Sequence, residues 1–166
     1  MSKIDSDFID MLKAAEAGDA EAQYRLGSYY YYGEVITKDG ATGIVYYRNG
    51  KEVTKDTAKA AVWLLKAAEQ GHARAQTKLG DCYRYGEGVA QNLPVADRQA
   101  KAAEWYRKAA DKDCAEAQFE LGQCYETGSC VPQNYANAAE WYTKAVKHGH
   151  KGAHDFLDEL KRTGRA

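Results

Sequence analysis

A repeated pair of helices constrains this chain more than any other feature of its sequence. In each copy, one helix ends at a Lys-Ala-Ala step, and after a tight turn a second helix carries Ala-Gln, Leu-Gly, Tyr and Gly. The clearest copy is residues 101–128, KAAEWYRKAADKDCAEAQFELGQCYETG. Self-similarity of this kind, with two helices per unit of ~30–40 residues, is typical of an α-solenoid. We therefore predict that one antiparallel helix pair is the building block of the fold.

Two columns of the repeat align the copies along the chain. They are the lysines Lys13, Lys66, Lys108 and Lys144 and the leucines Leu26, Leu79, Leu121 and Leu157. The interval from Lys to Leu is constant, so the extra residues lie between units. Gly follows the Leu in three copies, at Gly27, Gly80 and Gly122, where a small residue lets neighbouring helix backbones approach closely.

The repeat predicts an all-α fold of about four helix pairs in a single domain. The predicted units span residues 7–33, 57–88, 93–130 and 135–162. The last helix has a polar outer face, which suits a terminal repeat that no further unit covers.

The segment between the first two units has a different character. Two β-prone runs, 44–47 and 52–54, flank Asn49-Gly50. Asn-Gly between such runs indicates a hairpin, because both central residues of a type I′ turn need positive φ. We predict a small β-hairpin insertion near residues 34–56, packed against the solenoid because an isolated hairpin is marginally stable in water.

Length and charge restrict the possible functions. The 166 residues are about one domain's worth of chain, and their net charge is −1. Proteins that bind nucleic acid or anionic membranes need a basic surplus, so we expect neither partner. No apolar run is long enough to span a bilayer. The N-terminal MSKIDSDFID is acidic and polar, unlike a secretory signal, so we expect a cytoplasmic location.

Cysteines and histidines give no pattern of metal ligands. The four cysteines, Cys82, Cys114, Cys124 and Cys130, include no Cys-x-x-Cys pair, and we expect buried free thiols. Residues 148–154 contain three histidines, but these fall on repeat columns: His150 matches the loop residue His72, and His154 replaces the repeat Gln. We therefore expect no metal site and no cofactor.

Motifs of catalysis are likewise missing from the sequence. It contains no Gly-x-Gly-x-x-Gly, P-loop or Gly-x-Ser-x-Gly motif. The carboxylates Glu104 and Glu140 recur in one helix column, which indicates a surface position and not an acid–base pair in two environments. We therefore predict that the protein has no catalytic residues and is not an enzyme.

The repeat units resemble the Sel-1-like repeat family, which is related to tetratricopeptide repeats. The resemblance rests on AVWLLKAAEQGHARAQTKLGDCYRYGEGVAQN and AEWYRKAADKDCAEAQFELGQCYETGSCVPQN and covers about residues 7–162, with 34–56 outside the pattern. It implies a right-handed α–α superhelix of antiparallel helix pairs. It also implies an adaptor or scaffold role in signalling, secretion or host–microbe contexts, and a bacterial source.

A cysteine-rich branch of that family implies a different chemistry. Its disulfides join the two helices of each unit, through cysteines at the positions of Ala110 and Gln118 in this chain. Since neither residue is a cysteine, we do not expect those disulfides, or the penicillin-binding or β-lactamase-like activity of that branch.

The first helices of the units carry the main candidate binding site. In the tetratricopeptide-like arrangement these helices line the concave face. The sides opposite the core expose Ile9 and Leu12 in the first unit and Val62 and Leu65 in the second. We predict that these four residues dock a peptide or partner helix, with Arg107 as a charged neighbour. The alternative is that the inserted hairpin or packing between repeats covers them.

The inserted hairpin is a second candidate site, through Tyr46, Tyr47 and Arg48. Tyr and Arg are frequent in binding hot spots, and insertions on repeat scaffolds often map to the binding face.

The predicted function is a scaffold or adaptor that binds a peptide or partner protein on its concave face. Three alternatives stay open: a cytosolic immunity or regulatory protein that neutralises a toxin or effector, an enzyme of the cysteine-rich branch, and a module cut from a larger repeat array. The enzyme would need an accessible pocket and disulfides between helices.

Overall fold

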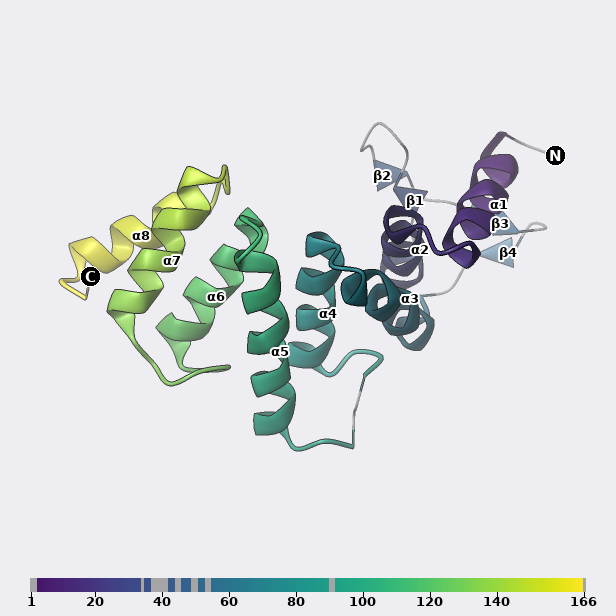
Figure 1. The fold of residues 1–166 in the computed structure, drawn as a ribbon. Coiled ribbons are helices and arrows are strands. Elements are labelled where there is room, and N and C mark those ends of the chain that lie inside the picture. The colour runs from purple at the N-terminus through teal and green to yellow at the C-terminus, as the bar shows by residue number, and fades with distance from the viewer. Residues whose placement is uncertain are drawn as a thin grey trace.

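The computed structural model describes residues 3–33, 35–36, 42–43, 46–48, 51–52, 55–89 and 92–165, and the side chains of residues 8–33, 55–89 and 92–165. The helices in these ranges are α1 (Lys3–Glu16), α2 (Ala20–Tyr32), α3 (Thr57–Glu69), α4 (Ala73–Tyr85), α5 (Val95–Ala110), α6 (Ala115–Thr127), α7 (Tyr135–Lys147) and α8 (Ala153–Arg162). They form four pairs in a curved row with the chain ends at opposite ends (Figure 1). The predicted all-α solenoid is confirmed.

The segment between α2 and α3 contains short strands: β1 (Val35–Ile36), β2 (Thr42–Gly43), β3 (Tyr46–Arg48) and β4 (Lys51–Glu52). β1 pairs antiparallel with β2, and β3 with β4. The prediction of one hairpin is not confirmed in that form, because there are two short pairs and Asn49-Gly50 lies outside the described residues. Sequence reasoning passed over Asp39-Gly40, a second hairpin signal in the interval between β1 and β2.

The second helix of three pairs ends on a glycine in the left-handed conformation. Gly33, Gly86 and Gly128 have φ of 71°, 72° and 70°, and each backbone N–H donates to the carbonyl four residues earlier. A residue without Cβ adopts this conformation at little cost, which explains the Gly column at the end of each unit. The turn inside each pair also needs a residue with positive φ: it is Gly18, Gly71 or Gly149 in three pairs and Asp113, at φ 59°, between α5 and α6. Asp tolerates this region better than most residues.

The Ala-Gln column closes the turn inside each pair. A buried Gln side chain donates through Nε2 to a carbonyl at the end of the preceding helix: Gln23 to Ala15 at 3.0 Å, Gln76 to Ala68 at 3.0 Å and Gln118 to Ala110 at 3.1 Å. Each of these carbonyls also accepts a backbone N–H from the turn, so the Gln adds a second hydrogen bond that ties the two helices of the pair together. In the fourth copy His154 replaces the Gln and is exposed.

The Leu-Gly column sets the distance between successive pairs. A Cβ atom on Gly80 would lie 2.5 Å from Cε1 of Tyr106, and one on Gly122 would lie 2.5 Å from Cδ1 of Tyr142. The ring of each Tyr therefore rests directly on the glycine of the preceding helix. Both tyrosines are fully buried, so this contact joins α4 to α5 and α6 to α7.

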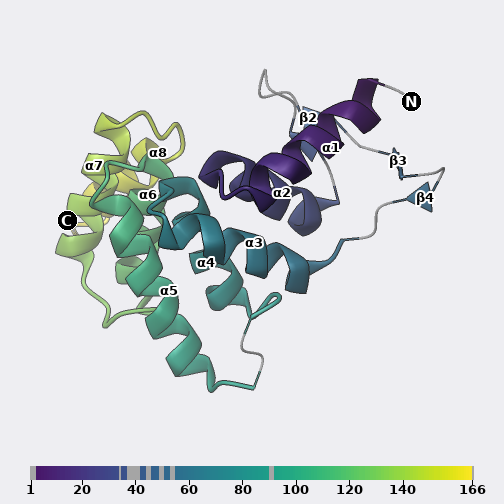
Figure 2. The same cartoon turned by 45° about the vertical axis from the view of Figure 1, so that its right-hand side comes forward.

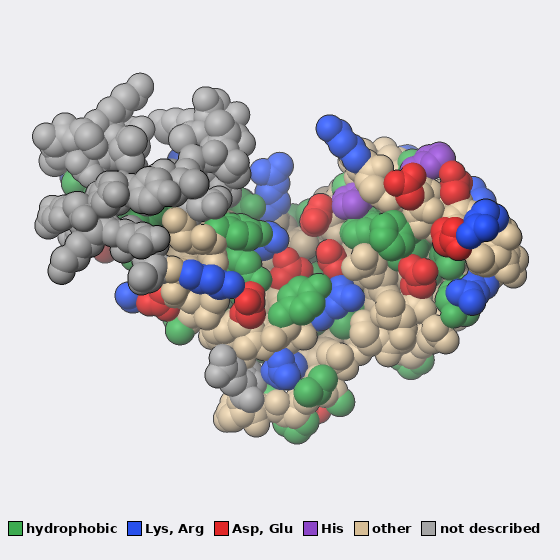
Figure 3. Space-filling view, turned by 180° about the vertical axis from the view of Figure 1, so that it is seen from behind, with side chains coloured by type: hydrophobic (Ala, Val, Ile, Leu, Met, Phe, Trp, Pro, Cys, Tyr) green, Lys and Arg blue, Asp and Glu red, His purple; other side chains and the backbone are tan. Residues whose placement is uncertain are grey.

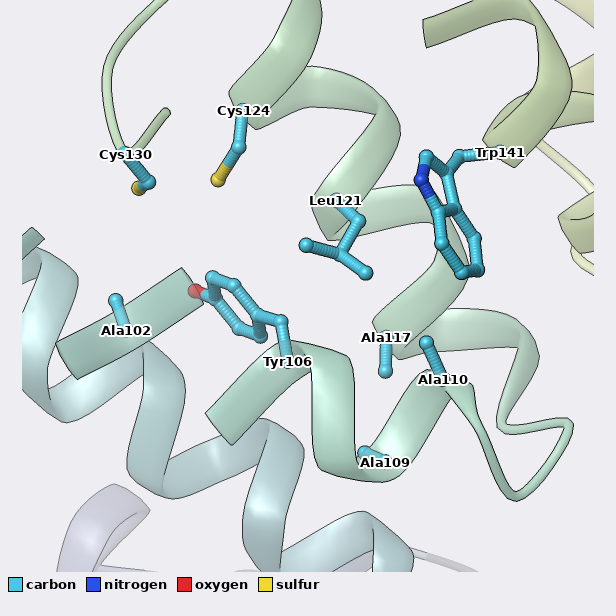
Figure 4. Close-up of a cluster of buried hydrophobic side chains, with 9 residues drawn as sticks. All are labelled: Ala102, Tyr106, Ala109, Ala110, Ala117, Leu121, Cys124, Cys130 and Trp141. Carbon is cyan, nitrogen blue, oxygen red and sulfur yellow. The ribbon is translucent and has the colours of Figure 1, made fainter. Parts of the chain in front are cut away.

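The tryptophan column also joins successive pairs. Trp63, Trp105 and Trp141 each pack against the buried cluster of the pair before their own. Figure 4 shows the cluster of α5 and α6, in which Trp141 lies beside Leu121 and several alanines. Each unit therefore completes the core of its neighbour. None of the described helices is both long and apolar enough to cross a membrane.

We expect Gly122→Ala to lower the free energy of unfolding. The added methyl group would overlap the Tyr142 ring, and overpacking a filled core costs typically ~1–3 kcal/mol, against a gain of ~1 kcal/mol in helix propensity. Urea denaturation followed by circular dichroism would measure the change. Gly152→Ala is the control, because its Cβ would meet only the His150 ring, at 3.6 Å. Equal stability of Gly122→Ala and the wild type would contradict this account.

Candidate partner-binding surface

In the middle of the curved row, the inner side is formed by the second helices α4 and α6. α4 and α6 contact each other, and this contact is more extensive than any between α3 and α5 or between α5 and α7. Figure 1 shows α4 and α6 on either side of α5, and Figure 2 shows the same helices turned by 45°. In a curved row, the helices that approach one another most closely lie on the inside.

This arrangement differs from our expectation that the first helices line the concave face. The large side chains Tyr106 and Tyr142 stand on first helices, whereas the second helices present Gly80 and Gly122 to them. These glycines let each second helix approach the first helix of the next pair closely. At the α4–α6 junction the second helices, and not the first helices of the tetratricopeptide analogy, therefore lie on the inner side.

The predicted apolar residues are mostly exposed. Val62 is 54% exposed, Leu65 37% and Ile9 36%, whereas Leu12 is half-buried against the cluster of α1 and α2. Trp63 of α3 packs against that same cluster, which places α1 and α3 around α2. Packing between repeats therefore covers Leu12 in part, but it leaves Val62 and Leu65 open on the outer side.

The other predicted residues do not join this apolar group. Arg107 donates from Nη2 to Oη of Tyr125 at 2.9 Å and lies over the Trp141 ring, 4.9 Å from its centroid. Arg107 therefore belongs to the second half of the solenoid. Tyr46, Tyr47 and Arg48 form β3, and their side chains lie outside the described residues.

A row of charged side chains crosses the inner side from α4 to α6. Nζ of Lys78 lies 3.0 Å from Oδ2 of Asp81. Nη1 of Arg84 lies 2.6 Å from Oε2 of Glu120 and 3.4 Å from Oε1 of Gln123. We call these five residues the inner row. Its four charged members keep between 13% and 24% of their side-chain surface exposed, so solvent still reaches them.

The solenoid core holds the inner row in place. The hydroxyl of the buried Tyr106 donates to Oδ1 of Asp81 at 2.9 Å, so the ring that rests on Gly80 also orients a charged side chain. A hydrogen bond to a charged group contributes about 1.5–3 kcal/mol, enough to fix a rotamer. The inner row is therefore positioned before any partner arrives.

Burial shifts the protonation of one member of this row. It raises the pKa of Glu120 to about 7, the negative charge of Asp81 adds to the increase, and the positive charge of Arg84 opposes it. Desolvation thus outweighs the close ion pair with Arg84. Near neutral pH, Glu120 can either accept hydrogen bonds as a carboxylate or donate one as a carboxylic acid.

Two exposed tyrosines flank the inner row. Tyr32 at the end of α2 is 46% exposed, and Tyr85 at the end of α4 is 61% exposed. Nζ of Lys78 lies 5.4 Å from the centroid of the Tyr32 ring, and Cζ of Arg84 lies 5.6 Å from that of Tyr85. In Figure 3, the face turned away in Figure 1 carries acidic, basic and hydrophobic side chains side by side over its middle.

Sequence reasoning missed the inner row, although the repeat contains a signal for it. The column of Lys78 holds Glu120 in the next copy, and the column of Asp81 holds Gln123. The Leu, Ala and Gly columns around them stay constant. Columns that change charge between copies cannot be core positions, and their place on the second helices could have pointed to a surface.

Two of the histidines, His72 and His150, take structural positions. Nε2 of His72 lies 2.9 Å from Oε2 of Glu21, and Nε2 of His150 lies 3.3 Å from Oε2 of Glu116. Both rings stack on an aromatic side chain of the helix that carries the Glu. Among the residues that the structure describes, no group of three His, Cys, Asp or Glu side chains is arranged to hold a metal ion.

The family model of the Sel1 repeat matches residues 20–48, 40–72, 73–114 and 115–150. The chain belongs to the Sel1 repeat family. Two of the matches run into the segment 34–56, which sequence analysis had left outside the repeat. No curated protein matches the chain significantly.

Solved structures of the family share this fold. A protective antigen present in uropathogenic Escherichia coli strains, c5321, is 31% identical over 93% of this chain, with a TM-score of 0.74. This chain spans only 28% of that protein. A Sel1 repeat protein from Oxalobacter formigenes is 32% identical over 92% of this chain and 98% of its own, with a TM-score of 0.67.

A cysteine-rich relative shares the fold alone. Helicobacter pylori cysteine rich protein B is 20% identical over 89% of this chain and 95% of its own, with a TM-score of 0.56. Sel1 repeat proteins generally mediate protein–protein interaction and are generally non-catalytic scaffolds.

We expect Glu120→Gln to flatten the pH dependence of stability. The folded protein holds the Glu120 proton more tightly than the unfolded chain, whose pKa is near 4.5. The free energy of unfolding should therefore fall as pH rises from about 4.5 to about 7, by at most ~3 kcal/mol. Urea titrations across this range measure the slope, and Glu104→Gln, at an exposed position on α5, should leave it unchanged. Identical slopes for Glu120→Gln and the wild type would contradict the assignment.

Proposed function

We propose that this protein is a scaffold or adaptor that binds a segment of a partner protein along the inner side of α4 and α6. The observation that carries the proposal is the inner row. Removing charges from water costs free energy, yet Lys78, Asp81, Arg84 and Glu120 are kept largely buried in a solenoid whose core is otherwise alanine, leucine and aromatic rings. A partner that uses these charges gives a reason for that cost.

The inner row suits a polar segment that carries both kinds of charge. Lys78 and Arg84 offer donors, whereas Asp81 and Glu120 offer acceptors, all within two neighbouring helices. Tyr32 and Tyr85 add exposed aromatic surface at the helix ends, and tyrosine and arginine are enriched in binding hot spots. A partner carboxylate that took the place of Glu120 beside Arg84 would keep the guanidinium paired, and Glu120, with its pKa raised to about 7, can take up a proton.

The apolar group on the outer side supports a second contact. Val62 and Leu65 are neighbours on α3, one turn apart, and Ile9 on α1 is also exposed. Side chains at such spacing suit an amphipathic partner helix. We propose this group, with Leu12 at its buried edge, as a separate docking surface that works without Arg107. A toxin or effector that the protein neutralises would be one kind of partner for either surface.

Site-specific photo-crosslinking tests the two surfaces separately. A benzophenone side chain in place of Tyr85 reports on the inner side, and one in place of Val62 reports on the outer side. Expressed in cells of the source organism, the Tyr85 variant should give a defined adduct that mass spectrometry identifies. The adduct should weaken at least tenfold when Arg84→Gln and Glu120→Gln are combined in the same protein, because both charged groups are replaced by neutral amides.

The matched control is Leu65→Glu, which should weaken adducts at position 62 and leave those at position 85 intact. Circular dichroism confirms that each variant is folded. Adducts at position 85 that persist in the doubly substituted protein would overturn the inner-side proposal. Adducts at position 62 that persist in Leu65→Glu would overturn the outer-side proposal.

A further inference from the structure

Two cysteines meet at the junction of the third and fourth helix pairs. Cys124 lies on α6, and Cys130 lies in the link 128–134 that leads to α7. Both side chains are buried in the cluster of α5 and α6. In Figure 4 the two side chains lie next to each other at the edge of the cluster, beyond the hydroxyl end of Tyr106.

The link is fixed against the end of α6, so the two cysteines are held together. The backbone N–H of Asn134 donates to the carbonyl of Tyr125 at 2.8 Å. Nε2 of Gln133 donates to the carbonyl of Glu126 at 2.8 Å. These bonds fold the link back along the last turn of the helix, where Cys130 reaches the side of Cys124.

The two neighbouring thiols affect each other, and this makes them chemically different. The neighbouring Cys124 thiol, supported by the hydroxyl of Ser129, lowers the pKa of Cys130 below its ordinary value. The neighbouring Cys130, together with burial, raises the pKa of Cys124. Of the two thiols, Cys130 is therefore the one that ionises more readily. Cys130 is also the more exposed of the two, at 9% against 0%.

The preceding repeat contains the same position without the second thiol. Cys82 stands in the column of Cys124, and the residue in the column of Cys130 is Gly88. A Cβ atom on Gly88 would overlap the carbonyl of Thr57, so no side chain fits there. Burial raises the pKa of Cys82 to about 12, which leaves it an inert thiol. Cys82 is therefore an internal control for the reactivity of the Cys124–Cys130 pair.

We propose that Cys124 and Cys130 form a reversible intramolecular disulfide when the protein meets a peroxide. The thiolate of Cys130 attacks the O–O bond of hydrogen peroxide, forms a sulfenic acid and releases hydroxide, which takes a proton and becomes water. The sulfur of Cys124 then attacks the sulfenic sulfur. Its proton leaves with the displaced hydroxide as a second water, so two thiols and one peroxide give one disulfide and two waters.

The bond would tie the link 128–134 covalently to α6. It differs from the disulfides of the cysteine-rich branch, whose positions are Ala110 and Gln118 in this chain. It would also remove the acidic thiol of Cys130, which the positive charge of Arg84 in the inner row helps to ionise. Oxidation would therefore remove one ionisable group from the surroundings of Arg84.

Peroxide titration of the reduced, full-length protein tests the proposal. One equivalent of hydrogen peroxide should remove two of the four thiols, lower the intact mass by two hydrogens and give one peptide pair that links Cys124 to Cys130. Dithiothreitol should restore all four thiols. Iodoacetamide at pH 7 should label Cys130 at least tenfold faster than Cys82, because the thiolate is the nucleophile.

Variants separate this pair from the other cysteines. Cys130→Ser and Cys124→Ser should each abolish the mass loss, whereas Cys82→Ser should oxidise like the wild type. If a serine variant folds poorly, identifying the disulfide-linked peptides of the oxidised wild-type protein is enough to decide the outcome. A disulfide that involves Cys82 or Cys114, a Cys130 sulfinic acid without a disulfide, or four thiols that survive the peroxide would each overturn the proposal.

Discussion

The close contact between the second helix of one pair and the first helix of the next is the constraint on which the rest of the structure depends. At each of these contacts a glycine receives a large side chain: Gly27 meets Leu64, Gly80 meets Tyr106 and Gly122 meets Tyr142. Because a Cβ atom cannot be accommodated there, the glycine sets the spacing and angle of successive units. The tryptophan column and the buried glutamines add to an arrangement that these contacts already determine.

The same contact connects the core to the surface. Tyr106 fills the space above Gly80 with its ring and reaches Asp81 with its hydroxyl. In the first junction Leu64 occupies this place and has no hydroxyl, and the residue in the Asp81 column is Ser28. The change from Leu64 to Tyr106 in the core column is thus accompanied by the change from Ser28 to Asp81 in the polar column. The inner row follows from the core packing at the second junction and is not an independent decoration of the surface.

Sequence reasoning succeeded where a property repeats along the chain and failed where it depends on a contact between copies. The helix pairs and the Gly-terminated second helices follow from local chemistry that every copy repeats. The exposed positions of Val62 and Leu65 follow from helix periodicity. The inner row does not, because Arg84 and Glu120 lie in different columns of different copies and meet only through the curvature. For the segment 34–56, the prediction of one hairpin used only the signal Asn49-Gly50, although the sequence also contains the signal Asp39-Gly40.

The sequence by itself determined the family, the number of helix pairs and the glycines that join them, because each of these is written in local spacing. Only the tertiary structure decided which helices lie inside the curve, and therefore which side chains share a surface. It also placed Cys130 against Cys124 in the third unit, although Cys82 in the second stands in the same column without a partner. The physical reason is that curvature and the path of a link depend on how large and small side chains meet across units, which no single copy of the repeat contains.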